Sequence, residues 1–163
     1  NVYAVFLDNE KAFNRLWHCG LLEKLKKLGI NAKMWRIIAH SNTQSSTYVT
    51  CRGGISNTFP LRKAVGQGRA MSAFLFHVYI NDLLNEVVMT NCGITRNQMN
   101  LPGMLLADDT TLLSFTLNGL QILANTAYQY ADEWRLKYNP NKSNWIILSR
   151  KMKCTQQMEL LWG

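Results

Sequence analysis

The sequence predicts a single α+β domain in which an antiparallel sheet packs on helices. Apolar runs rich in β-forming residues lie near both ends of the chain, and apolar residues recur at helical spacing between them. A pair of adjacent acids also separates two short apolar runs, which is the pattern of a tight hairpin. With 163 residues, 47% of them hydrophobic, the chain is long enough to bury one core.

The first elements predicted are a strand and two helices. Residues 2–7 (VYAVFL) form an unbroken apolar run typical of a buried central strand, which Asp8 ends. Leucines at helical spacing predict a helix over residues 21–28, which Gly29 terminates. A second helix is expected over residues 32–40.

A hairpin and a long helix are expected next. The polar, β-prone stretch 43–61 has Gly53 and Gly54 at its centre, which predicts a hairpin with a glycine turn. Ser72 is a candidate N-cap for a long apolar helix running through residues 74–88.

The last predicted elements are a hairpin with two acids at its tip, a helix and a strand. Two brief apolar runs, MLLA and TTLLS, are separated only by Asp108 and Asp109, so the acids are expected at the hairpin tip. A helix over residues 119–136 and a strand over 145–148 complete the domain.

Charge and cysteine content limit which kinds of protein the chain can be. The 18 Lys and Arg residues exceed the 10 acids, and the formal net charge of +8 suits a polyanionic partner. The four cysteines are widely spaced, which predicts reduced, mostly buried thiols. No apolar run approaches the ~18 residues that span a bilayer, and no secretion signal opens the chain. We therefore expect an intracellular protein of the nucleus or cytoplasm that is not secreted and has no membrane partner.

The acids are the candidate site. Asp8 ends one central strand and Asp108 and Asp109 lie at a hairpin tip, so Asp8 and Asp108 are expected to converge. Grouped carboxylates are costly unless a cation neutralises them, and hard divalent ions prefer oxygen ligands. The alternative is that the adjacent acids only form a turn and that Asp8 caps a helix.

Four segments together resemble the reverse transcriptases of non-LTR retrotransposons. Residues 6–30 resemble motif A, with its D-x-x-K-A-F core at Asp8, Lys11, Ala12 and Phe13. The three later segments are similar to motifs B, C and D, and they lie at 59–84, 105–114 and 134–151.

The resemblance implies a polymerase palm-type domain, an RNA-directed DNA polymerase with two Mg²⁺ ions, for which Mn²⁺ could substitute. It makes Asp8 and Asp108 the principal metal ligands and Asp109 the supporting acid, and it makes Lys142 a general acid for the leaving pyrophosphate. The alternative for Lys142 is a solvated loop lysine.

The other implied contacts are with the nucleotide and the template. The backbone from Asn9 through Lys11 to Ala12 would pass beside the triphosphate, and Phe13 would exclude a ribose 2′-hydroxyl, unless it is an ordinary core residue. Gln67 and Gly68 would contact the templating pair, although a Gln-Gly pair alone is usually only a loop.

The implied partners are an RNA template, a DNA primer, deoxynucleoside triphosphates and the rest of a parent polyprotein. That polyprotein would supply the fingers and the thumb, with or without an endonuclease, so the chain is interpreted as an incomplete palm with little or no polymerase activity alone. Departures from the motifs, such as Asn14 and Leu106, leave all three carboxylates in place. A catalytically silent remnant or domesticated nucleic-acid-binding module is the alternative, and the form of motif A argues against a group II intron-type enzyme or an RNA polymerase.

Overall fold

The chain folds as two compact units. The computed structural model describes residues 1–60, 71–97, 99–106 and 108–149. One unit comprises Phe13–Tyr79, and the other joins Asn1–Ala12 to Ile80–Gly163. Both helices and antiparallel strands are present, which confirms the predicted α+β class. The interpretation of the whole chain as one domain stays a prediction.

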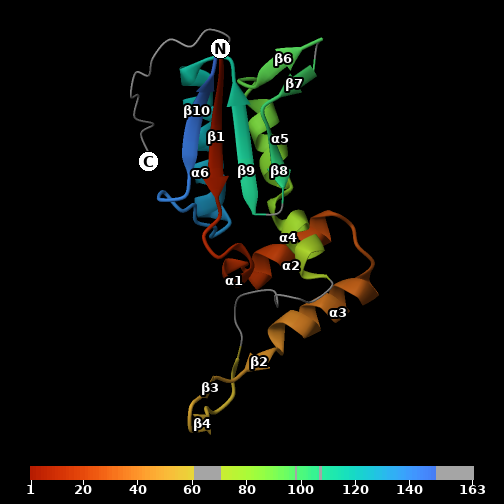
Figure 1. Cartoon of the computed structure of the whole chain (residues 1–163). Helices are drawn as coiled ribbons and strands as arrows, with labels where there is room; N and C mark the ends of the chain where they lie inside the picture. The colour runs from red at the N-terminus through yellow and green to blue at the C-terminus, as the bar shows by residue number, and fades with distance from the viewer. Residues whose placement is uncertain (61–70, 98, 107, 150–163) are drawn as a thin grey trace. The chain divides into compact units, whose positions relative to one another are not determined.

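The second of these units, hereafter the sheet unit, is built on a four-stranded antiparallel sheet. Its strand order is β10-β1-β9-β8, and helices α5 and α6 lie behind it (Figure 1). The strands are β1 (Val2–Asp8), β8 (Gly103–Leu106), β9 (Asp109–Ser114) and β10 (Asn144–Leu148), and the helices are α5 (Asp82–Met89) and α6 (Leu117–Glu133).

One face of this sheet is covered and the other is open. Along β1, Val5 and Leu7 are at most 1% exposed whereas Phe6 between them is 42% exposed, as expected when alternate side chains point to opposite faces. Buried residues of β9 and α6 complete the core on the covered face, among them Leu112, Leu120, Leu123, Ala127 and Tyr130. The face that carries Phe6 is therefore the one available to a ligand.

Two parts of the fold differ from the prediction. The helix expected through residues 74–88 is two helices, α4 (Ser72–Ile80) and α5, and Ser72 is the first helical residue rather than the N-cap. The interruption is at Asn81, whose carbonyl accepts a bond from Leu84 N–H only three residues later. A short hairpin, β6 (Ile94–Arg96) with β7 (Met99–Leu101), was not predicted.

The first unit, hereafter the helical unit, contains the predicted helices and hairpin. Gly29 has φ +72° after α2, and the Asn31 side chain caps α3 by accepting a bond from Lys33 N–H at 2.8 Å. Trp35 Nε1–H donates to the Leu22 carbonyl at 2.9 Å, which ties α3 to α2. The helices are α1 (Ala12–Arg15), α2 (His18–Lys27) and α3 (Ala32–Thr43), and the hairpin strands are β2 (Ser46–Thr47), β3 (Thr50–Cys51), β4 (Gly54–Ile55) and β5 (Phe59–Pro60).

The expectation of mostly buried thiols was wrong. Cys19 and Cys51 are exposed and Cys92 is half-buried, each as a free thiol. Cys19 lies on the solvent side of α2, and Cys51 lies in a hairpin that covers no core. Within the described residues, no helix is both long and apolar enough to cross a bilayer.

Candidate active site

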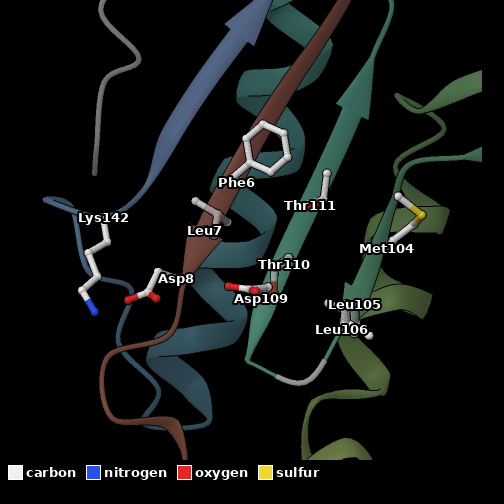
Figure 2. Close-up of a pocket in the computed structure, with 10 residues that line it drawn as sticks. All are labelled: Phe6, Leu7, Asp8, Met104, Leu105, Leu106, Asp109, Thr110, Thr111 and Lys142. Carbon is white, nitrogen blue, oxygen red and sulfur yellow. The ribbon is translucent and has the colours of Figure 1, made fainter.

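Two acidic residues are paired with each other on the open side of the sheet. The antiparallel register of β1 with β9 pairs Asp8 with Asp109. Figure 2 shows the Asp109 carboxylate directed toward β1 and the Asp8 carboxylate directed toward Lys142, with α6 on the far side of the sheet. Directly opposed residues in such a ladder have Cβ atoms about 4.5–5.5 Å apart. Because like charges on directly opposed residues repel, the pair is a place where a cation would be stabilising.

Asp108 lies in the turn between β8 and β9 and is half-buried. Its backbone carbonyl accepts two bonds from Asn9, one from the side-chain Nδ2–H at 2.9 Å and one from the main-chain N–H at 3.4 Å. These bonds fasten the turn to the end of β1. The sequence led us to expect Asp8 beside Asp108, whereas the register places Asp109 directly opposite Asp8 and Asp108 one residue further into the turn.

The end of β1 is also fastened on its other side. The Asp8 carbonyl accepts a bond from Asn139 N–H at 2.8 Å, and Asp8 N–H donates to Ser143 Oγ at 3.3 Å. The Ser143 hydroxyl in turn donates to the Asn139 carbonyl at 2.8 Å. The segment from Asn139 to Ser143 therefore holds the backbone of Asp8 in place and leaves the Asp8 carboxylate free to point outward.

Lys142 lies in the segment from Asn139 to Ser143, and it lines a hollow in the surface that Asp8 and Asp109 also line. The hollow has a volume of about 500 Å³, and Figure 2 shows Lys142 beside Asp8 and on the opposite side of it from Asp109. Its remaining lining comes from β1, β8 and β9: Phe6, Leu7, Met104, Leu105, Leu106, Thr110 and Thr111. Three of the predicted site residues, distant in sequence, thus share one surface.

Behind the carboxylates lie three buried polar atoms without a well-formed hydrogen bond: Asn9 Oδ1, Thr110 Oγ1 and Tyr138 OH. Asn9 also forms an isolated antiparallel bridge with Tyr138, so these groups adjoin the strand end that carries Asp8. Burial raises the pKa of Tyr138 above its ordinary value, and the nearby Thr110 hydroxyl offsets only part of that rise. Tyr138 is therefore a neutral phenol at physiological pH.

The side-chain hydrogen bonds of Asn9 and Ser143 that hold the site were not predicted from the sequence. Their partners are 99 and 135 residues away along the chain. The one local signal is that Asn9 is a polar residue directly after an apolar strand, and this is equally typical of a solvated turn. Asn9 is instead 3% exposed.

The structure describes only part of the other predicted contact residues. Lys11 is exposed and has a φ of +53°, a left-handed conformation uncommon for a residue other than glycine. Ala12 is buried, and Phe13 is half-buried with its ring 5.3 Å from that of Phe76. The proposed sugar contact of Phe13 stays a prediction, as does the triphosphate contact at Lys11 and Ala12. Gln67 and Gly68 lie outside the described residues.

Substituting Asn9 by leucine, which is similar in size, tests how the turn is held. The free energy of unfolding is expected to fall by roughly 1–3 kcal/mol because the Nδ2–H bond to Asp108 is lost and leucine offers no donor. Asn125→Leu, at an exposed position on α6, should change it by less than about 0.5 kcal/mol. Urea unfolding of both variants measures the difference, and equal effects would show that the Asn9 bond contributes nothing.

The described residues contain no group of three or more His, Cys, Asp or Glu side chains arranged to hold a metal ion. The observed donor set is the opposed pair Asp8 and Asp109, with Asp108 adjacent in the chain. Oxygen donors on an open polar edge suit a hard divalent cation that keeps part of its water shell.

Comparison with known proteins gives the family. The sequence model described as "Reverse transcriptase (RNA-dependent DNA polymerase)" matches residues 1–159. The chain belongs to the reverse transcriptase family. The match includes every residue of the carboxylate site, and the resemblance to non-LTR retrotransposon enzymes is confirmed. Reverse transcriptases as a family bind RNA templates and use divalent metal ions.

Two curated relatives cover most of this reverse transcriptase chain. It is 27% identical over 161 residues to the RNA-directed DNA polymerase from mobile element jockey of Drosophila melanogaster, with 93% of the chain and 17% of the relative covered. It is 30% identical over 149 residues to the probable RNA-directed DNA polymerase from transposon BS of the same organism, with 86% and 16% covered. The chain therefore spans only about a sixth of the length of these relatives.

The fold is shared with solved telomerase structures. Apo telomerase from Candida tropicalis, truncated from its C-terminal domain, matches with a TM-score of 0.70 at 16% identity. The match covers 94% of this reverse transcriptase chain and 32% of the telomerase chain. At this identity the match supports the palm-type α+β fold and nothing more specific.

Proposed function

We propose that this chain is the catalytic palm of an RNA-directed DNA polymerase, which adds deoxynucleotides to a primer 3′-hydroxyl on an RNA template. The observation that carries the proposal is the register that sets Asp8 opposite Asp109 on the open sheet face, next to the Asp108 turn. The reverse transcriptase family model matches residues 1–159, which include all three acids. The partners in this proposal are the RNA template, a DNA primer, deoxynucleoside triphosphates and further parts of a longer, intracellular polyprotein.

The carboxylates fit a pair of Mg²⁺ ions, with Mn²⁺ as a possible substitute. Asp8, Asp108 and Asp109 would hold them, because these side chains offer hard oxygen donors whose mutual repulsion a cation relieves. When bound, such ions lower the pKa of the primer hydroxyl and neutralise charge on the triphosphate.

The other residues orient the reactants and move a proton. Lys142, beside Asp8 in the hollow, would donate a proton to the leaving pyrophosphate. Phe13 would admit a deoxyribose and exclude a ribose by steric contact with its 2′-hydroxyl. The backbone at Lys11 and Ala12 would lie beside the triphosphate, and Gln67 with Gly68 would contact the templating base pair.

Binding of a deoxynucleoside triphosphate to the isolated chain tests the proposal without requiring a bound primer. Mg²⁺ is expected to raise the affinity for a fluorescent dTTP analogue at least tenfold in fluorescence anisotropy, and EDTA should reverse the gain. A nucleotide affinity that does not respond to Mg²⁺ or Mn²⁺ would instead identify the chain as a catalytically silent relative.

A further inference from the structure

The hairpin from Ser46 to Pro60 exposes apolar side chains that no part of the described chain covers. Its strands pair only over short stretches, β2 with β5 and β3 with β4. Every residue of this segment except the half-buried Thr47 is exposed. The large apolar side chains on it are Tyr48 (55% exposed), Val49 (57%), Ile55 (69%) and Phe59 (45%). A two-stranded hairpin is marginally stable in water, and a cluster of exposed apolar groups marks a contact surface.

The charge of the surrounding unit identifies the kind of partner. Ten of the 18 Lys and Arg residues lie within Phe13–Tyr79, together with only one of the ten acids, Glu23. The helical unit therefore has a formal charge of +9, and the rest of the chain has −1. No Asp or Glu occurs in the sequence between Glu23 and Asp82. The net positive charge of the protein is thus confined to the unit that carries the hairpin.

Several of these cations are free to bind an anion. Lys26 on α2, Lys33 and Arg36 on α3, and Arg52 at the hairpin turn are all exposed. Within the described part of the chain, Lys27 pairs with Glu23 at 3.0 Å, and none of these four cations forms an ion pair. Arg52 precedes Gly53, whose φ is +105°, at the tip where β3 turns into β4.

We propose that the hairpin Ser46–Pro60 binds single-stranded nucleic acid. Tyr48 and Phe59 provide rings on which unpaired bases stack, and Arg52 pairs with a phosphate, the combination by which proteins hold single strands without reading sequence. A polyanion also explains why the stretch around the hairpin lacks acids, which a protein partner would not require. The inference rests on the proposed function for its ligand class and adds a binding surface outside the carboxylate site.

The test measures binding of a fluorescein-labelled oligouridylate of about 15 nucleotides to the intact chain by anisotropy, with EDTA present throughout. Tyr48→Leu removes the ring but keeps an apolar side chain, and it should weaken binding roughly 5- to 50-fold. Arg52→Gln should weaken binding several-fold and reduce the slope of affinity against salt by about one. Arg96→Gln is the matched control, because Arg96 is an exposed arginine beside the turn of the β6–β7 hairpin in the sheet unit.

The outcomes separate this proposal from its rivals. Equal losses for Arg52→Gln and Arg96→Gln would mean that net charge alone binds the RNA, and unchanged binding by Tyr48→Leu would remove the hairpin from the contact. A concentration-dependent dimer that Tyr48→Leu disrupts in sedimentation, with RNA binding intact, would assign the surface to a second copy. All three positions are exposed, so the variants should unfold within about 0.5 kcal/mol of the unmodified chain.

The same assay separates failure of this inference from failure of the proposed function. Oligonucleotide binding by the hairpin needs no metal ion and is measured in EDTA, whereas the proposed polymerase function requires nucleotide binding that depends on Mg²⁺. RNA binding through the hairpin without any Mg²⁺-dependent nucleotide binding would support the surface and overturn the polymerase proposal. The opposite pattern would overturn the surface alone.

Discussion

Replacing Asp8 by asparagine is expected to lower the affinity for a deoxynucleoside triphosphate in Mg²⁺ at least about tenfold, which removes the gain that Mg²⁺ gives. Loss of residues that only orient metal ligands costs about 10- to 100-fold, and Asp8 would be a ligand itself. The side chain keeps its shape, and the backbone bonds to Asn139 and Ser143 do not involve the carboxylate. The variant should therefore fold normally and lose only the metal-dependent part of binding.

The same substitution should raise the free energy of unfolding when no metal is present. Directly opposed like charges on neighbouring strands are destabilising, so removing one member of the Asp8–Asp109 pair should gain about 0.2–1 kcal/mol in EDTA. With Mg²⁺ added, the unmodified chain should have the higher free energy of unfolding of the two, because the ion binds only its folded state.

Urea unfolding with and without Mg²⁺, together with nucleotide anisotropy, measures both effects. Glu133→Gln serves as the control, since Glu133 is an exposed acid at the end of α6, away from the hollow. The control should change neither quantity by a measurable amount. If Asp8→Asn destabilised the metal-free chain and left nucleotide binding unaltered, the carboxylate pair would be a structural feature and not a metal site.

Much of the site could be predicted because its elements carry strong local patterns. The apolar run before Asp8 and the two short runs around the paired acids correspond to β1, β8 and β9 of one sheet. Gly29 ends α2 where a glycine was expected to end it. These features depend on residues close together in sequence, which is where propensity and periodicity are informative.

The register at the tip of the hairpin could not be predicted from the same residues. Strand β8 ends at Leu106 and β9 begins at Asp109, so Asp109 and not Asp108 pairs with Asp8. Neither flanking run alternates clearly between apolar and polar residues, and no Asn-Gly or Asp-Gly pair fixes the turn type. A shift of one residue would have exchanged the faces of the two acids, and tertiary contacts decide between the registers.

Long-range polar contacts are the second thing that the sequence did not predict. Asn9 and Ser143 position the carboxylates through bonds to partners far along the chain, and each looks like an ordinary loop residue in its own neighbourhood. The break at Asn81 is similar, because a continuous apolar pattern over residues 74–88 offers no signal for a locally tightened turn. Such features follow from packing in three dimensions and not from local preference.

Gly103→Ala is expected to destabilise the chain by roughly 1–3 kcal/mol or more, although it adds only one methyl group. Gly103 begins β8 and pairs with Leu112 of β9. A Cβ at this position would collide with the Thr111 carbonyl oxygen and approach the Leu112 Cα at 3.1 Å. Because the obstruction is backbone on the neighbouring strand, no side-chain rotation can relieve it, and the two strands must move apart.

The strands that would separate carry the Asp108–Asp109 turn, so stability and nucleotide binding should fall together. Gly54→Ala is a matched control, since a Cβ at Gly54 meets nothing within 4 Å and the change should stay within about 0.5 kcal/mol. Urea unfolding and Mg²⁺-dependent nucleotide anisotropy are measured on both variants. If Gly103→Ala behaved like Gly54→Ala, β8 would not approach β9 as closely as the pairing requires, and the placement of Asp109 opposite Asp8 would lose its physical basis.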